Sequence, residues 1–220
     1  PDGLLESFDL YFGETETPEL YTADVISPVT VPVDHAKTYY LGVMGFDSQE
    51  SLKAESTVSE ICIGLPIVFG GSSSDSGLSV VETSDGGLVV TGYTNSFGNG
   101  DQVYLLKTDS NGDLLWEKNF GGTSDDYGHS VVETSDGGLV VTGYTESFGN
   151  CWQVYLLKTD STGNLLWEKN FGGTGGDVGY SVVETSDGGL VVTGFTDCFG
   201  NGNQVYLLKT DSNGDLLWEK

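Results

Sequence analysis

A repeat of 51 residues dominates the chain from residue 69 onward. Its three copies, residues 69–118, 120–169 and 171–220, align without a gap, and the first two are identical at 41 of 50 positions. Each copy contains four short apolar runs rich in Val, Leu, Tyr and Trp, separated by clusters of Gly, Asp, Asn and Ser. Such runs predict strands, and none has the periodicity of a helix. We therefore expect three nearly equal units of four strands.

The turn residues and the continuous apolar runs indicate which all-β fold the four-stranded units form. The segments Ser84–Gly87 and Asp109–Asp113 contain Asp-Gly and Asn-Gly, which are strong hairpin signals. The runs LVV and VYLL are continuous rather than alternating, which indicates burial on both faces of a sheet. A four-stranded unit that is covered on both faces and repeats at this period is typical of a β-propeller blade. The predicted class is all-β, with three four-stranded β-propeller-type blades over residues 66–220.

One hairpin carries a family resemblance. The pattern D-x-x-G-x-x-x-W occurs once per copy, at Asp109, Gly112 and Trp116, at Asp160, Gly163 and Trp167, and at Asp211, Gly214 and Trp218. It resembles the tryptophan-docking turn of quinoprotein-like propellers. The fuller pattern is similar to propeller-type repeats of large secreted microbial surface proteins. The resemblance covers about 150 residues. It implies an extracellular or cell-surface location and a Trp that packs between neighbouring blades.

Residues 1–65 contain no copy of the repeat. The segments Phe8–Gly13, Thr38–Gln49 and the closing STVSEICIG resemble strands of a fibronectin type III module. In that family the pattern TYY…V…D precedes the last strand, and here its places are taken by Tyr39, Tyr40, Val43 and Asp47. The resemblance implies an antiparallel β-sandwich. It would be a partial one, because 65 residues are fewer than the roughly 100 of a seven-stranded sandwich.

The number of blades predicts association with something larger. Propellers need roughly four to eight blades to close, and the chain has three copies of the repeat. The remaining blades and strands come either from a longer chain of which this is an excerpt or from neighbouring subunits. Because an open strand edge is a template for pairing, we expect self-association by strand pairing or by blade packing.

Composition excludes several classes of function. The chain has 33 acidic residues and 8 lysines, without arginine, so its formal net charge is −25. Such a chain repels phosphate backbones, which argues against a nucleic-acid partner. No apolar run approaches the roughly 20 residues of a membrane span. No motif of a hydrolase or metalloprotease occurs, His35 and His129 lie in different domains, and the recurring Glu82, Glu133 and Glu184 are typical of solvated strand ends. We therefore expect a non-catalytic protein.

The turn DSNGD offers a possible calcium site. Its acidic and amide oxygens alternate along a tight turn, as in the first ligand positions of a calcium loop. The same residues also serve as an ordinary hairpin turn, so both interpretations stay open. Ca²⁺ is the only cofactor that the sequence suggests. The candidate ligands are Asp109, Asn111, Asp113, Asp160, Asn164, Asp211, Asn213 and Asp215.

Two cysteines and one tryptophan break the repeat pattern, and a third cysteine, Cys62, precedes the repeats. Cys151 and Cys198 replace small residues in the same loop of adjacent copies, so we predict a disulfide between them and an oxidising compartment. Cys62 would then be buried and free, or bonded to another chain. Trp152 replaces a polar residue in that loop and is a candidate contact for a glycan, a protein or a neighbouring subunit.

These features predict an extracellular structural protein that serves as a subunit or module of a cell-surface or filamentous assembly. The alternative is a glycan- or protein-binding propeller module of a larger secreted protein.

Overall fold

The structure, a computed structural model, describes the backbone of five strands within residues 7–63 and all of residues 68–149, 151–198 and 202–220. By its internal contacts the chain divides into two units, Pro1–Val68 and Phe69–Lys220. The described part of the chain is all-β, and it includes no helix that could cross a membrane.

The described part of the first unit forms five strands in one antiparallel sheet of order β2-β1-β3-β4, with β5 also paired to β3. Side chains before residue 68, and the segment that holds His35, lie outside the described residues. The fibronectin type III-like sandwich and the state of Cys62, which lies on β5, therefore stay predictions. The strands are β1 Ser7–Gly13, β2 Leu20–Thr22, β3 Lys37–Phe46, β4 Leu52–Glu55 and β5 Ser59–Ile63.

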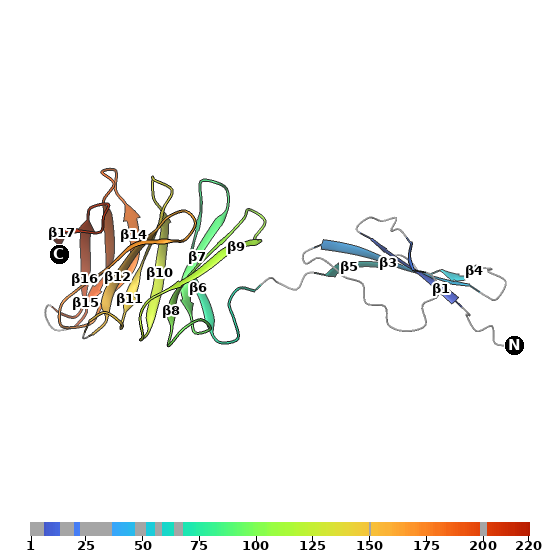
Figure 1. Cartoon of the computed structure of the whole chain (residues 1–220), viewed down its shortest axis with the longest axis horizontal. Coiled ribbons are helices and arrows are strands. Elements are labelled where there is room, and N and C mark those ends of the chain that lie inside the picture. Colours follow the sequence, from blue (N-terminus) through green and yellow to red (C-terminus); the bar gives the residue numbers. More distant parts are fainter. Residues whose placement is uncertain are drawn as a thin grey trace. The chain divides into compact units, whose positions relative to one another are not determined.

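The second unit contains three four-stranded antiparallel sheets, one for each copy of the repeat (Figure 1). In each sheet the strands pair in chain order, which confirms the two hairpins that the turn signals predicted and adds the pairing of the second strand with the third. Sheet 1 has β6 Asp75–Glu82, β7 Leu88–Thr94, β8 Gln102–Thr108 and β9 Leu114–Phe120. Sheet 2 has β10 Asp126–Glu133, β11 Leu139–Thr145, β12 Gln153–Thr159 and β13 Leu165–Phe171. Sheet 3 has β14 Asp177–Glu184, β15 Leu190–Thr196, β16 Gln204–Thr210 and β17 Leu216–Glu219.

The first hairpin of each sheet is shaped by glycine at two places. In sheet 2 the turn contains Gly137 at a φ of +78°, a conformation that residues with a Cβ rarely adopt. Between β10 and β11 the pairing shifts at a bulge between Gly128 and Ser130. Opposite the bulge, a Cβ added to Gly143 would lie 1.7 Å from the carbonyl oxygen of Tyr127, so the strands can approach this closely only at a glycine.

The sheets pack face to face, and the third strand explains why its apolar run is continuous. On β12 every residue is buried. Tyr155 and Leu157 join a cluster with residues of sheet 1, whereas Val154 and Leu156 join a second cluster with residues of sheet 3. Successive side chains of a strand point to opposite faces, so a strand covered on both sides is apolar throughout. The predicted burial on both faces is confirmed for sheet 2.

Candidate functional site

The interface between neighbouring sheets is the most developed feature of the repeat unit. A serine in the first turn of one sheet binds a glutamate at the end of the first strand of the next sheet. Ser84 donates to Glu133 through its backbone N–H at 2.7 Å and through its hydroxyl at 3.0 Å. Ser135 makes the same two hydrogen bonds to Glu184 at the same distances. We call this paired contact the Ser–Glu clamp.

A tryptophan forms the second contact of the interface. In sheets 1 and 2 it lies near the end of the sheet and packs on the last turn of the following sheet. A Cβ added to Gly163 would lie 2.8 Å from the ring of Trp116, and one added to Gly214 would lie 2.8 Å from the ring of Trp167. The Trp therefore packs between neighbouring sheets, as the resemblance to tryptophan-docking turns implied.

A third contact joins the loops at the opposite end of the sheets. The backbone N–H of Asp126 donates to the carbonyl of Asp101 at 2.7 Å, and that of Asp177 donates to the carbonyl of Trp152 at 2.9 Å. At the end of the sheets where the tryptophans pack, Lys169 of sheet 2 forms an ion pair with Asp215 of sheet 3 at 3.1 Å. Polar contacts at both ends therefore frame an apolar centre.

The two outermost faces of the stack expose residues that are buried inside it. On sheet 1, Val80 is 62 % exposed, whereas its counterparts Val131 and Val182 are 6 % and 4 % exposed. On sheet 3, Val205 is 79 % exposed, whereas its counterparts on β8 and β12 are 0 % exposed. Tyr104 and Leu106 on β8 are buried, so the exposed part of the first face is formed by β6 and β7. Each end thus presents half of the interface.

Sequence reasoning missed the clamp. It treated the recurring glutamates as solvated strand ends, but Glu133 and Glu184 bind serines of the preceding sheet. The signal was present in the sequence, because Glu at the end of the first strand and Ser in the turn recur together in all three copies. What the sequence lacks is the stagger between sheets, which brings a turn of one sheet beside the strand end of the next.

The turn proposed for calcium is held by its own first aspartate. The Asp109 carboxylate accepts from the N–H groups of Asn111 at 2.8 Å and Asp113 at 3.0 Å, and these hydrogen bonds lower its pKa. Asp160 and Asp211 do the same in the other copies, and Asp215 is also an ion-pair partner. No group of three His, Cys, Asp or Glu residues suited to a metal occurs among the described residues. Calcium binding stays a prediction.

A lysine from the third strand of each sheet forms an ion pair with an aspartate in the first turn of the same sheet. Lys158, whose side chain is nearly buried, forms an ion pair with Asp136, which also accepts from Thr134 and from the N–H of Gly138. The hydrogen bond to Lys158 has the largest effect, and together these contacts lower the pKa of Asp136 to about 2. Lys107 with Asp85 and Lys209 with Asp187 repeat the arrangement.

The two cysteines of the repeat unit are free in this structure. The thiol of Cys151 donates to the carbonyl of Thr174 at 3.3 Å, and that of Cys198 accepts from the N–H of Gly175 at 3.1 Å. The C=O and N–H of one trans peptide point in opposite directions, so this peptide group stands between the two thiols. The disulfide predicted from the sequence is therefore not formed here, and Cys198 instead contacts Asp177 at 3.2 Å, in the place of the serine of the other copies.

Aromatic rings run without interruption across the three sheets. Neighbouring ring centroids are 4.8 to 5.9 Å apart along this aromatic run. Trp152, which is 46 % exposed, donates from Nε1 to Glu146 at 2.6 Å and lies against Tyr144. His129 lies at the bulge, contacts the carbonyl of Gly179 at 2.9 Å, and has a pKa lowered by burial. The aromatic run comprises Tyr93, Tyr127, Tyr144, Trp152, His129, Tyr180 and Phe195.

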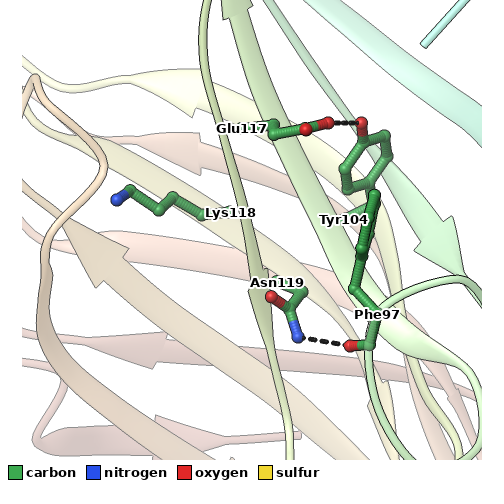
Figure 2. Close-up of a pocket in the computed structure, with 5 residues that line it drawn as sticks. All are labelled: Phe97, Tyr104, Glu117, Lys118 and Asn119. Carbon is green, nitrogen blue, oxygen red and sulfur yellow. Dashed lines mark hydrogen bonds between the residues drawn. The ribbon is translucent and has the colours of Figure 1, made fainter. Parts of the chain in front are cut away.

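A small hollow in sheet 1 is lined by five residues, Phe97, Tyr104, Glu117, Lys118 and Asn119, and the side chain of Lys118 points away from the other four (Figure 2). The hydroxyl of Tyr104 donates to Glu117, and the amide of Asn119 donates to the carbonyl of Phe97 at 2.7 Å. Four of the five lining residues are thus paired by hydrogen bonds, and Phe148 and Tyr155 repeat the aromatic contact of Phe97 and Tyr104 in sheet 2. The hollow therefore reflects the repeat rather than a separate site.

Comparison with known proteins identifies no relative: no protein-family model matches the chain, and no curated protein matches it significantly.

Proposed function

We propose that this protein is a non-catalytic structural subunit of an extracellular assembly, in which the sheets act as propeller-type blades and further copies of the repeat cover the two open faces. One observation carries the proposal. The interface that forms twice within the chain leaves its two complementary halves exposed, Val80 and its neighbours on sheet 1 and Val205 and its neighbours on sheet 3. The extracellular location rests on the resemblance of the repeat to those of secreted surface proteins.

The energetics favour this proposal. Exposed apolar faces of a stack are costly in water, and burying an aliphatic side chain contributes about 1.5–3 kcal/mol. A face that is already shaped to receive a copy of the repeat needs no rearrangement on association, so little of that gain is lost to ordering. A contiguous apolar surface on a soluble chain is typical of an interaction site.

Sedimentation velocity over a concentration series tests the proposal. We expect the 220-residue chain to sediment as a species larger than one chain, with the fraction of that species rising with concentration. Electron microscopy of the same samples would show whether the species are discrete or extended. A chain that stays monomeric up to about 100 μM, which corresponds to weaker than about 5.5 kcal/mol of association, would contradict an assembly function.

A second candidate function is carbohydrate binding, because the aromatic run offers a partly exposed platform. Sugar rings stack on aromatic faces, and adjacent carboxylates accept hydrogen bonds from their hydroxyls. Trp152 and its partner Glu146 combine both features on one loop. Saturable quenching of tryptophan fluorescence by soluble oligosaccharides, abolished by Trp152→Ala, would support this candidate. Quenching that persists in the variant would contradict it.

A further inference from the structure

The contacts inside the chain specify what would cover its ends. Each interface joins the later face of one sheet to the earlier face of the next, and the sequences of these faces are nearly identical in the three copies. The later face of sheet 3 and the earlier face of sheet 1 are the two halves that have no sheet against them within the described repeat unit. Sheet 3 of one molecule therefore has the surface that sheet 1 of a second molecule is shaped to receive.

Apolar groups at the two ends correspond one to one. Trp218 is 38 % exposed, although its counterparts Trp116 and Trp167 each cover a glycine of the next sheet. Gly112 is the glycine at that position in sheet 1, and nothing lies within 4 Å of a Cβ placed on it, whereas the equivalent glycines are covered. Trp218 of one copy thus matches the vacant place above Gly112 of another.

Polar groups at the two ends correspond as well. The Ser–Glu clamp would form between Ser186, the serine of the last sheet, and Glu82, the glutamate of the first, since both occupy the repeat positions of the clamp. The ion pair between Lys169 and Asp215 would be repeated by Lys220 and Asp113, at the same repeat positions.

The charged pair also distinguishes the proposed junction from the interface of sheets 1 and 2. At the interface of sheets 1 and 2, Lys118 faces the position of Asn164, which has no charge. An end-to-end junction would therefore carry an ion pair that this internal interface lacks.

We propose that sheet 3 of one copy of residues 1–220 docks on sheet 1 of a second copy with the geometry of the internal interfaces, and that two such copies close a ring of six sheets through two junctions. The inference rests on the proposed function, because it takes the sheets to be propeller blades. A head-to-tail interface gives a closed ring when its rotation closes and a filament when it does not. Propellers have about four to eight blades, and six is the multiple of three within that range.

The first experiment measures the mass of the assembly by sedimentation equilibrium and light scattering. A single species of two chains, with no larger species on further concentration, is the expected result. A ladder of larger species without a limiting mass would overturn ring closure while leaving the proposed assembly function in place. A persistent monomer would overturn both.

The second experiment tests which faces meet. Val80→Glu and Val205→Glu each place a charge on one end face, at side chains that are exposed in a single copy, so both variants should fold. Each alone should associate about 100-fold more weakly than the unmodified chain, because a carboxylate resists burial in an apolar junction. Leu166→Glu is the matched control, since Leu166 and its counterparts Leu115 and Leu217 are equally exposed in all three sheets.

Mixing the two variants gives the sharpest outcome. The Val80→Glu chain keeps an intact sheet 3, and the Val205→Glu chain keeps an intact sheet 1, so an equimolar mixture should form one good junction and sediment as a heterodimer. If sheet 3 paired with sheet 3, the Val80→Glu variant would still dimerise alone. That result, or a mixture that stays monomeric while the unmodified chain dimerises, would overturn the head-to-tail arrangement.

Discussion

Single residues set how closely the strands of a sheet can approach. At Gly143 a side-chain carbon would lie 1.7 Å from the carbonyl oxygen of Tyr127, and backbone atoms cannot yield as a flexible side chain can. A Cβ added to Gly92 or to Gly194 would lie at the same distance from the corresponding carbonyl oxygen. The recurrence of TGYT and TGFT in the repeat thus has a steric cause rather than a functional one.

We predict that Gly143→Ala destabilises the repeat unit by about 3 kcal/mol or more, because the first hairpin of sheet 2 must separate to admit the methyl group. Urea unfolding followed by tryptophan fluorescence measures the change. Gly176→Ala is the control, since a Cβ there would make its nearest contact at 3.5 Å, an ordinary van der Waals distance. Equal stability losses in both variants would contradict the steric explanation.

The aspartate of the first turn predicts how stability depends on pH. The pKa of Asp136 falls from 3.8 to about 2 in the folded chain, chiefly through its hydrogen bond to Lys158. A carboxyl with a lowered folded pKa contributes stability that is fully present above the unfolded pKa and is lost as the pH falls through the folded pKa. The contribution should therefore persist above about pH 4 and disappear between about pH 4 and 2.

Thermal unfolding measured by circular dichroism from pH 7 to pH 2 tests this pH dependence. The Asp136→Asn variant should be less stable than the unmodified chain at pH 7, and the difference should shrink toward pH 2. A stability difference in Asp136→Asn that stays constant across the range would exclude the ion pair as its source.

At the scale of the element, the sequence predicted the strands of each repeat but not which residues of neighbouring sheets contact one another. The hairpin signals and the continuous apolar run of β12 fixed four strands per repeat and burial on both faces. The Ser–Glu clamp and the free thiols escaped prediction because both depend on the stagger of one sheet against the next. Aligning Cys151 with Cys198 by repeat position placed them in one loop, but it could not show the peptide of Thr174 and Gly175 between them.

The same element has different environments at the middle and at the end of the stack, and this predicts unequal effects of one substitution. Trp167 covers the turn of sheet 3, whereas Trp218 covers no turn among the described residues of its own chain. Trp167→Ala should therefore cost about 1–2 kcal/mol more folding stability than Trp218→Ala at concentrations where the chain is monomeric. Chemical denaturation of both variants under dilute conditions makes the comparison, and similar losses would show that the Trp stabilises its own sheet alone.

At the scale of the whole molecule, charge opposes the association that the end faces favour. Each chain carries a formal charge of −25, so two copies repel each other over distances that depend on ionic strength. The screening length shortens from about 30 Å at 0.01 M salt to about 10 Å at 0.1 M. The end faces themselves are largely apolar, so their attraction changes little with salt, and the repulsion between the bodies of the two chains becomes the variable quantity.

We therefore predict that association strengthens with added salt, by about tenfold in Kd between 10 and 100 mM NaCl. Sedimentation velocity at a fixed protein concentration measures the shift. An interface dominated by the ion pair of Lys220 and Asp113 would instead weaken with added salt, because screening weakens attraction as well as repulsion.

Repeating the series with MgCl₂ and CaCl₂ at matched ionic strength separates general screening from the binding of a specific cation. An effect larger for Ca²⁺ than for Mg²⁺ would favour the calcium interpretation of the DSNGD turns. Equal effects would leave those turns with a structural role alone.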